Sequence, residues 1–354
     1  MKYITEGVKY TGSKLKMLQH ILQTVCNLSF KSVLDGFAGT TRVSQLFAQL
    51  GYNTTCNDSA IWSTVFGNCY LLSNKPNSFY QPYIDELNSL EPIYGWYSEH
   101  YGSDDPFGKK PFQLKNTMKL DSIRDRIDTY DLNYIDKCVL LTSLILALDS
   151  VDNTLGHYAS YLKGWSKRSY NDLELKLPKR FEICSKNKVL NKDVFDVVNE
   201  YHDLAYFDPP YGSNNDKMPA SRVRYNAYYH IWKSIILNDK PEVFGKCDRR
   251  VDSKDTVSKS VFEEFKKDEN GFLAMQAIQK LIANTNSKYV LLSYSSGGRT
   301  SKEELYDILN SSGKLLECKE IDYKKNVMGN MRWTNDWVNT DGKYFEYLFL
   351  IEKF

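Results

Sequence analysis

Apolar and small residues mark a strand, a loop and a helix early in the chain. The stretch SVLDGFAGTTRVSQLFAQLG (residues 32–51) opens with a short apolar run that ends at Asp35. A loop of small residues follows, and apolar residues then recur at helical spacing through RVSQLFAQL. We expect this helix to be capped by Thr40 or Thr41 and to stop at Gly51, because glycine commonly follows a helix end.

A second strand follows, and it too ends in an acid. The segment YNTTCNDSA (52–60) ends its strand at Asn57 and Asp58. Strand, glycine loop, helix and acid-terminated strand make up half of a doubly wound nucleotide-binding sheet, in which such an acid holds a ribose diol. The loop is not G-x-G-x-x-G, which disfavours a dinucleotide pyrophosphate. The pattern therefore favours a nucleoside ligand that has no phosphate to cradle.

The alternating pattern breaks after residue 70 and resumes near residue 185. Between these points, helical periodicity around 117–150 indicates an inserted, mainly helical module covering 71–184. Residues 1–70 and 185–354 then form the main domain. Its later elements are strands near 188–198 and in LAYFDPPYG, a helix at 271–285, a strand at 288–296, and a final strand that is half of an antiparallel hairpin at the sheet edge.

Composition excludes several classes of protein. The net charge of +2 over 354 residues does not indicate a nucleic-acid partner, so any basic surface must be local. Seven scattered cysteines without a CxxC pair indicate reduced thiols rather than disulfides or a zinc site. The opening MKYITEGVKYTGSKLK has no signal-like apolar stretch, and VLLTSLILAL (139–148) is too short to span a bilayer. We expect a soluble, cytoplasmic protein with no membrane segment.

Four aspartates are expected at the carboxyl ends of the strands, where ligands bind in an open α/β sheet. These are Asp35, Asp58, Asp193 and Asp208. Four carboxylates on one rim repel each other unless a cationic or donor-rich ligand lies between them. S-adenosylmethionine supplies a sulfonium, an ammonium, a ribose diol and an adenine amine. A divalent metal is the alternative, but metal sites cluster their carboxylates, whereas these end separate strands, so no metal is expected.

The segment FDPPYG (207–212) suits the activation of an exocyclic amine on a base. Ionised Asp208 can accept one N–H of that amine, and the carbonyl of Pro209 can accept the other. Pro209 and Pro210 stiffen the loop and remove competing donors, and Tyr211 can stack on the base. The alternative is that Pro-Pro and Gly form an ordinary turn.

Three motifs in this order resemble the D12-class, Dam-like adenine-specific DNA methyltransferases with the alpha arrangement. KYTGSK (9–14) is similar to that family's N-terminal cofactor motif, LDGFAGTT to its glycine loop, and FDPPYG to its catalytic motif. Two positions depart from the pattern: Tyr10 stands where such enzymes usually carry Trp, and Thr41 replaces the last glycine of the loop. The resemblance spans nearly the whole chain but is specific only at these motifs.

The resemblance implies a fold, a cofactor and a site. The fold is a Rossmann-like, mostly parallel S-adenosylmethionine-dependent methyltransferase sheet with an antiparallel edge hairpin, and the 71–184 insertion recognises the DNA target. Lys14 meets the methionine carboxylate of S-adenosylmethionine. The cofactor-binding residues are Tyr10, Lys14, Asp35, Phe37, Gly39, Asp58, Asp193 and Asp208, and the catalytic residues are Asp208, Pro209, Pro210 and Tyr211.

Two sets of basic residues are candidates for contacts with DNA phosphates, although a solvated helix face is the plainer reading. One lies in YLKGWSKRSY and the other follows the catalytic motif. Tyr225 and Tyr229 are candidates to support a flipped base. The basic candidates are Lys163, Lys167 and Arg168, then Arg222, Arg224, Arg249 and Arg250.

These features predict a bacterial, site-specific methyltransferase that acts on adenine in double-stranded DNA. We expect it to be the modification enzyme of a restriction–modification system, with a cognate restriction endonuclease as a candidate partner. One alternative is an RNA adenine methyltransferase, because the same motif serves both substrates. Another is a catalytically silent DNA-binding subunit of a restriction complex, against which the intact Asp208 and Lys14 argue.

Overall fold

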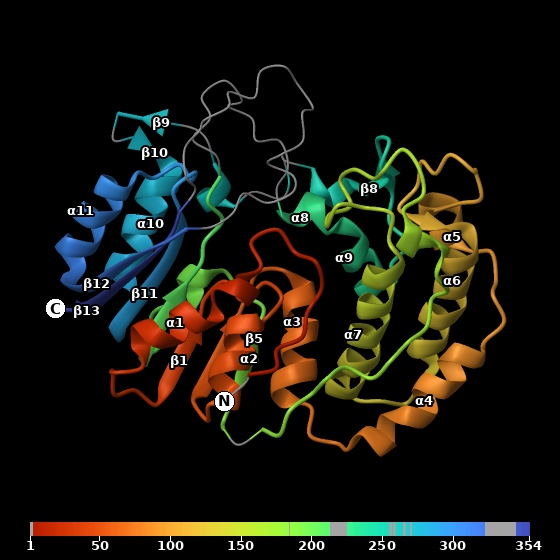
Figure 1. Ribbon diagram of the computed structural model, residues 1–354, viewed down its shortest axis with the longest axis horizontal. Helices are drawn as coiled ribbons and strands as arrows, with labels where there is room; N and C mark the ends of the chain where they lie inside the picture. Colours follow the sequence, from red (N-terminus) through yellow and green to blue (C-terminus); the bar gives the residue numbers. More distant parts are fainter. Residues whose placement is uncertain are drawn as a thin grey trace. The chain divides into compact units, whose positions relative to one another are not determined.

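A single sheet organises the part of the chain that the structure describes (Figure 1). The computed structural model describes residues 3–183, 185–212, 225–254, 257, 260–264, 267–269, 271–322 and 345–354. Seven strands form a sheet in the order β12-β13-β11-β6-β1-β2-β5. They are β1 (Ser32–Asp35), β2 (Asn53–Asn57), β5 (Lys188–Leu190), β6 (His202–Phe207), β11 (Ser287–Ser295), β12 (Gly313–Asp322) and β13 (Phe345–Lys353).

The direction of the strands confirms the predicted fold class. β6 pairs in parallel with β1 and β11, and β2 pairs in parallel with β5. β13 is antiparallel to both β11 and β12, so β12 and β13 form the predicted hairpin at one edge. The fold is therefore α/β, with a mostly parallel, Rossmann-like sheet.

Burial follows the position of each strand. The last four residues of β6 are all buried, as expected for a central parallel strand that is covered on both faces. In β12 only Gly313 is buried; the other positions are partly or fully accessible, and several of them are charged. Charged side chains are typical of an edge strand, where they oppose pairing with another chain. The same charges interrupt the apolar run, which is why the sequence pattern did not predict β12.

The chain divides into two compact units, and one division falls inside the glycine loop. The first unit comprises Met1–Leu18, Ala38–Lys192 and Val223–Ser258, and the second comprises Gln19–Phe37, Asp193–Arg222 and Lys259–Phe354. The assignment of 71–184 to DNA recognition remains a prediction.

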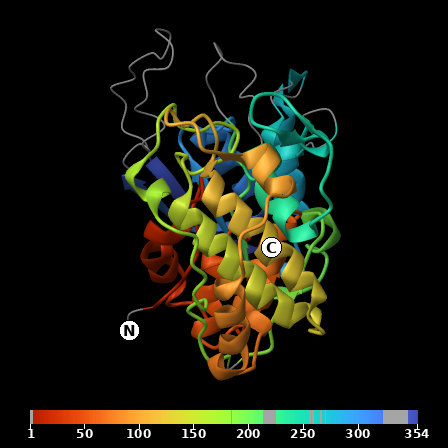
Figure 2. The same cartoon turned by 90° about the vertical axis from the view of Figure 1, so that its right-hand side faces the viewer.

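Among the described residues, a large cluster of buried apolar side chains lies in the first unit, and most of its members are on helices. Figure 2 shows these helices. The predicted buried helix is confirmed as part of α7, in which residues 138–145, 147 and 148 are buried. α7 packs against α3, α4 and α6. The helices are α2 (Arg42–Gln49), α3 (Ile61–Gly67), α4 (Asn77–Ser89), α5 (Trp96–Tyr101), α6 (Leu114–Thr129), α7 (Tyr134–Val151), α8 (Tyr225–Tyr228) and α9 (His230–Leu237).

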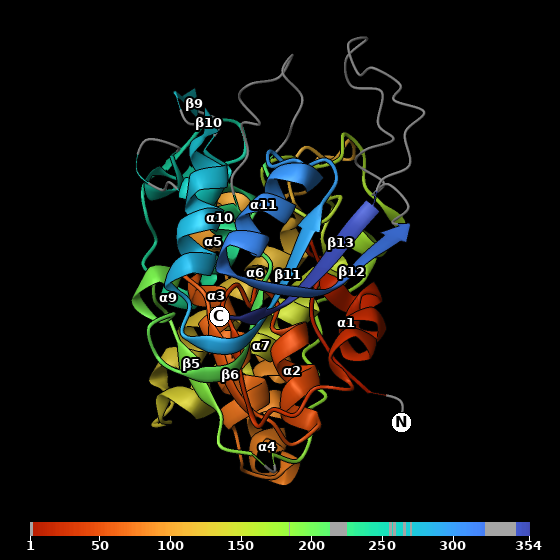
Figure 3. The same cartoon turned by 90° about the vertical axis from the view of Figure 1, so that its left-hand side faces the viewer.

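In the second unit, α10 (Leu273–Asn284) and α11 (Lys302–Ser312) pack side by side, and α11 lies against β12 (Figure 3). The start of α11 is fixed by a capping box, in which Ser301 and Glu304 satisfy each other's backbone amides. The other helix assigned mainly to this unit is α1 (Leu18–Val25).

Short elements complete the described part. The small strand pairs are β3 (Gly102–Ser103) with β4 (Phe112–Gln113), β7 (Val243–Phe244) with β8 (Arg249–Arg250), and β9 (Lys267–Asp268) with β10 (Gly271–Phe272). Single turns of helix are η1 (Lys14–Lys16), η2 (Asn68–Leu72), η3 (Lys167–Tyr170), η4 (Val194–Asp196), η5 (Val251–Ser253) and η6 (Val261–Glu263). Within the residues described, no helix has both the length and the apolar character needed to cross a membrane.

Candidate functional site

The glycine loop leaves β1 in tight contact with two other segments of the second unit. A Cβ atom on Gly36 would lie 2.7 Å from the ring of Phe207 and 3.2 Å from Val194 Cγ2, so only glycine fits there. The Gly36 amide also donates to the carbonyl of Tyr206 at 3.0 Å. Phe37 then packs edge-on against Phe207, with ring centroids 6.3 Å apart.

These contacts bring three of the predicted aspartates onto neighbouring backbone. Gly36 follows Asp35, Val194 follows Asp193, and Phe207 precedes Asp208. Asp35 is only 1% exposed, whereas Asp193 is exposed and accepts a hydrogen bond from the Phe195 amide at 3.0 Å. Asp35 ends β1, Asp208 follows β6 directly, and Asp193 precedes the short helix η4, whose Val194 lies against Gly36. Among the described residues, no group of three or more His, Cys, Asp or Glu side chains is placed to hold a metal ion.

In the first unit, Asp58 fastens the remainder of the glycine loop. Its Oδ2 accepts from the Gly39 amide at 2.8 Å and its Oδ1 accepts from the Ala60 amide at 2.9 Å. Burial raises the pKa of Asp58, and hydrogen bonds from the Ala60, Gly39 and Ser59 amides oppose that shift. The structure thus brings Asp58 and Gly39 together, and the carboxylate supports the loop in addition to any contact with a ligand.

Thr41 occupies the expected cap position of α2 but does not cap the helix with its side chain. Its backbone is left-handed, with φ at 62°, a conformation that favours glycine. The buried Thr41 hydroxyl instead accepts from Gln45 Nε2 at 3.0 Å. The residue that departs from the family pattern therefore has a left-handed backbone conformation that glycine adopts readily.

A ladder of aromatic rings fixes the segment that carries Tyr10 and Lys14. Tyr10 stacks on Tyr229, with ring centroids 4.6 Å apart, and Tyr229 stacks on Trp232 at 4.4 Å. The Tyr229 hydroxyl also accepts from the Thr11 amide at 2.8 Å. A Cβ on Gly39 would lie 3.2 Å from the Tyr10 ring, so Tyr10 adjoins the glycine loop.

Two of the candidate residues in this part of the first unit, Lys14 and Tyr229, are buried. Lys14 is 7% exposed, which is unusual for a lysine. Tyr229 is fully buried within the aromatic ladder, and its role in supporting a flipped base remains a prediction.

The catalytic motif follows directly from β6 in the second unit. The Tyr211 hydroxyl forms hydrogen bonds with Asp208 Oδ1 and with Glu346 Oε1. Its ring lies against Tyr294, with centroids 4.9 Å apart, and its carbonyl accepts from the Arg299 amide at 3.0 Å. Burial, followed by the charges of Asp208 and Glu346, raises the pKa of Tyr211. Pro209 is buried, so the motif is held at several points.

Sequence reasoning missed Glu346 as part of this cluster. It lies on β13, in the run KYFEYLFLIEKF, where it is the charged residue before five buried ones. An acidic residue within such an apolar run indicates a candidate site residue, because burying a carboxylate costs free energy unless it is hydrogen-bonded.

The predicted DNA-contacting arginines differ in what their guanidinium groups bind. Arg168 donates to the Asp152 and Thr154 carbonyls and pairs with the Asp152 carboxylate. Arg250 is 3% exposed and binds Asp239 through two bonds of 2.6 and 2.7 Å. It also binds both carboxylate oxygens of Asp252 at 3.0 Å. These contacts give both arginines a role within the fold, whereas Arg222 and Arg224 lie outside the described residues.

Three loops of the first unit that carry the other basic candidates lie together. We call residues 103–110, 159–168 and 243–250 the three-loop surface. The Tyr161 hydroxyl donates to the Lys246 carbonyl at 2.9 Å, and Trp165 Nε1 donates to the Asp105 carbonyl at 2.7 Å. Phe107 stands 72% exposed on the first of these loops. Exposed or partly exposed basic residues on this surface are Lys109, Lys110, Lys163, Lys167, Arg168, Lys246 and Arg249, of which Lys110 and Arg168 are paired with Asp248 and Asp152.

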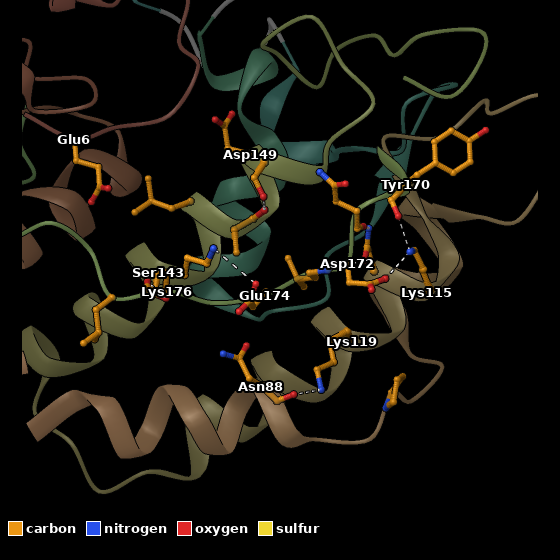
Figure 4. Close-up of a pocket in the computed structure, with 18 of the residues that line it drawn as sticks. Glu6, Asn88, Lys115, Lys119, Ser143, Asp149, Tyr170, Asp172, Glu174 and Lys176 are labelled. Atoms are coloured by element: carbon orange, nitrogen blue, oxygen red, sulfur yellow. Dashed lines mark hydrogen bonds and ion pairs between the residues drawn. The ribbon is translucent and has the colours of Figure 1, made fainter. Parts of the chain in front are cut away.

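A separate cavity of about 1260 Å³ lies in the first unit among α4, α6, α7 and residues 170–179 (Figure 4). Its lysines bind neighbouring groups: Lys115 pairs with Asp172, and Lys119 donates to the Asn88 carbonyl at 2.8 Å. None of the predicted catalytic, cofactor-binding or DNA-binding residues lines it. The cavity is therefore distinct from the candidate site.

Comparison with known proteins identifies the family. A family model described as D12 class N6 adenine-specific DNA methyltransferase matches residues 10–308. The chain belongs to this family, as the three motifs predicted.

Individual relatives cover the chain almost completely. It is 30% identical to modification methylase StsI of Streptococcus sanguinis, over 98% of this chain and 52% of that protein. It is 28% identical to type II methyltransferase M.FokI of Planomicrobium okeanokoites, over 98% of this chain and 53% of that protein. It is also 28% identical to type II methyltransferase M.NlaIII of Neisseria lactamica, over 98% of this chain and 99% of that protein. The chain thus spans about half the length of the first two relatives and nearly all of the third.

Proposed function

We propose that this chain is a site-specific methyltransferase that transfers a methyl group to the exocyclic amine of adenine in double-stranded DNA. The observation that carries the proposal is the Asp208-Pro-Pro-Tyr211 motif at the end of β6, beside the end of β1. Family membership and relatives named modification methylases and type II methyltransferases support it. We extend the proposal to a modification enzyme in the bacterial cytoplasm, paired with a restriction endonuclease.

The methyl donor in the proposal is S-adenosylmethionine, which methyltransferases of this family use. When bound, it supplies an electrophilic methyl group. The residues present fit it: buried Lys14 suits the donor's carboxylate, and Asp58 beside the Gly39 amide suits its ribose diol. Tyr10, Asp35, Phe37 and Asp193 complete the proposed set, which includes no metal ion.

Asp208 and Pro209 have the central role in the proposed chemistry. The amine of adenine is a poor nucleophile, because its lone pair is delocalised into the ring. Asp208 accepts one N–H and the Pro209 carbonyl accepts the other, so the nitrogen becomes pyramidal and its lone pair turns toward the methyl group. Pro210 and Tyr211 hold this loop in place. Catalysis on this view is orientation and fixed electrostatics.

In this proposal the three-loop surface binds the phosphate backbone of the DNA. An adenine in a duplex must be rotated out of the helix before it reaches such a pocket, at a cost of a few kcal/mol. Phosphate contacts from Lys163, Lys167 and Arg249 offset this cost. Phe107, which is 72% exposed, suits insertion between base pairs, as apolar wedges do in other DNA-distorting proteins.

A labelling experiment tests the substrate and the reaction together. The chain is incubated with tritiated-methyl S-adenosylmethionine and either genomic DNA or total RNA, and the labelled nucleoside is identified after digestion. We expect label on N6-methyldeoxyadenosine from DNA, and at least about 10²-fold slower labelling with the Asp208→Ala variant. Label confined to RNA would overturn the DNA assignment, and label on cytosine would overturn the role given to the motif.

A further inference from the structure

The hydroxyl of the catalytic-motif tyrosine is shared between two carboxylates. Glu346 is 5% exposed on β13, and its Oε1 accepts from Ser293 Oγ on β11 at 2.8 Å. The same Oε1 is bonded to the Tyr211 hydroxyl, which is also bonded to Asp208 Oδ1. Ser293, Glu346, Tyr211 and Asp208 thus form a continuous chain of hydrogen bonds from the sheet to the catalytic carboxylate.

The single proton of the Tyr211 hydroxyl limits how many hydrogen bonds this series of side chains can form at one time. A phenol carries one O–H, so the Tyr211 hydroxyl donates to only one of the two carboxylates at a time. A bond from this hydroxyl to Asp208 would be charge-assisted and would draw electron density from that carboxylate. Asp208 would then be a weaker acceptor for an amino group. A bond to Glu346 leaves Asp208 the stronger acceptor.

We propose that Glu346 is a positioning residue that draws the Tyr211 proton toward β13 and thereby strengthens Asp208 as an acceptor. This inference rests on the proposed function, because the group that Asp208 accepts from is the adenine amine. Glu346 acts through Tyr211 and does not touch the reacting atoms. Ser293 holds Glu346 in place by its 2.8 Å bond to the same oxygen.

The test removes the negative charge of Glu346 and keeps a side chain of nearly the same shape. Glu346→Gln leaves a neutral, weaker acceptor, so the Tyr211 proton turns to Asp208. We expect kcat to fall about tenfold, because one charge-assisted bond is redirected at the reacting centre. The Kd for S-adenosylmethionine should stay within twofold, which also reports that the variant is folded. Glu352→Gln is the matched control, since Glu352 lies on the same strand, is 42% exposed and pairs with Lys288 at 3.9 Å.

A second substitution separates this mechanism from a purely structural role. Tyr211→Phe removes the proton that Glu346→Gln misdirects, so the double variant should recover the kcat of Tyr211→Phe alone. A merely structural Glu346 predicts that the double variant is slower than either single one. Unchanged kcat in Glu346→Gln, or failure of Tyr211→Phe to rescue it, overturns the proposal.

A stability measurement, which does not need enzymatic activity, separates a failure of the proposed function from a failure of the role proposed for Glu346. If the parent chain labels no DNA, the proposed function fails, and the Tyr211–Glu346 contact is tested by urea unfolding of the parent, Glu346→Gln, Tyr211→Phe and the double variant. Non-additive shifts in the unfolding midpoint are expected for residues that share a hydrogen bond. Additive shifts, or loss of folding in Glu346→Gln that Tyr211→Phe alone does not share, overturn the assigned contact.

Discussion

Arg249 and Arg250 are adjacent and chemically identical, yet the structure predicts opposite results for their removal. Arg250 is 3% exposed and is bonded to two carboxylates, those of Asp239 and Asp252. Arg249 is partly exposed, and its guanidinium lies 4.7 Å from the ring centroid of Phe244. Arg250→Ala should therefore reduce stability, and Arg249→Ala should reduce binding to DNA.

The size of each effect follows from burial. Removing one partner of a fully buried ion pair costs about 3–5 kcal/mol. Because Asp239 and Asp252 are 38% and 39% exposed, water can rehydrate them after the change. We therefore expect Arg250→Ala to lower the free energy of unfolding by about 2–3 kcal/mol. Arg249→Ala should lower it by less than about 1 kcal/mol, the value of an exposed cation–π contact.

The pH dependence of unfolding gives an independent check. Hydrogen bonding to Arg250 is the largest contribution that lowers the pKa of Asp252, from 3.8 to about 2. A carboxylate whose pKa is lower in the folded state stabilises the fold above its unfolded pKa, and this contribution is lost as pH falls through the folded value. The parent should lose about 1 kcal/mol between pH ~4 and ~2, after discounting for solvent exposure. Arg250→Ala should lose much less over the same range.

Urea unfolding measures the loss of stability expected for Arg250→Ala. DNA binding at several salt concentrations measures the loss of a phosphate contact expected for Arg249→Ala. Arg249→Ala should reduce the slope of log affinity against log salt by about 0.9, the contribution of one phosphate contact on B-DNA. The reasoning is refuted if Arg250→Ala unfolds at the parent urea concentration while it flattens the salt dependence.

Three further predictions concern catalysis, the cofactor and the DNA. Asp208→Ala should cut methyl transfer at least about 10²-fold with little change in cofactor affinity, by analogy with the loss of one preorganised hydrogen-bond partner; methylation of duplex DNA near the parent rate would contradict the mechanism. Lys14→Ala should weaken S-adenosylmethionine binding by about 1.5–3 kcal/mol in calorimetry, because it removes a charge-assisted bond; unchanged affinity would remove Lys14 from the proposed pocket. Phe107→Ala should diminish the fluorescence rise of a duplex with 2-aminopurine at the target adenine, at unchanged cofactor affinity; a full rise would exclude Phe107 as a wedge.

Elements with strong local patterns were predictable from sequence. The strands ending at Asp35 and Phe207 are short apolar runs, and the helix within 139–148 is apolar on all sides. The glycine loop was recognisable because small residues follow a strand and precede a helical period. Gly36 confirms the reason for a glycine there, since a Cβ would clash with Phe207.

Features that depend on tertiary contacts were not predictable. Nothing in the local sequence separates Arg249 from Arg250; the difference arises because β8 turns Arg250 toward Asp239, eleven residues earlier in the chain. Glu346 joins the catalytic motif through a separation of 135 residues. The apolar pattern does not predict β12, because an edge strand tolerates charges that a central strand excludes.

Asp58 shows why the predicted role of a residue and its structural role must be tested together. The sequence placed it at the end of a strand as a ribose ligand, yet its two carboxylate oxygens hold the amides of Gly39 and Ala60. Each oxygen has a second lone pair, so the two roles are compatible. Loss of cofactor affinity in Asp58→Ala alone would therefore follow from a displaced glycine loop as well as from a lost ribose contact. A cofactor analogue that lacks the ribose hydroxyls separates these causes, because a displaced loop weakens its binding too, whereas a lost ribose contact does not.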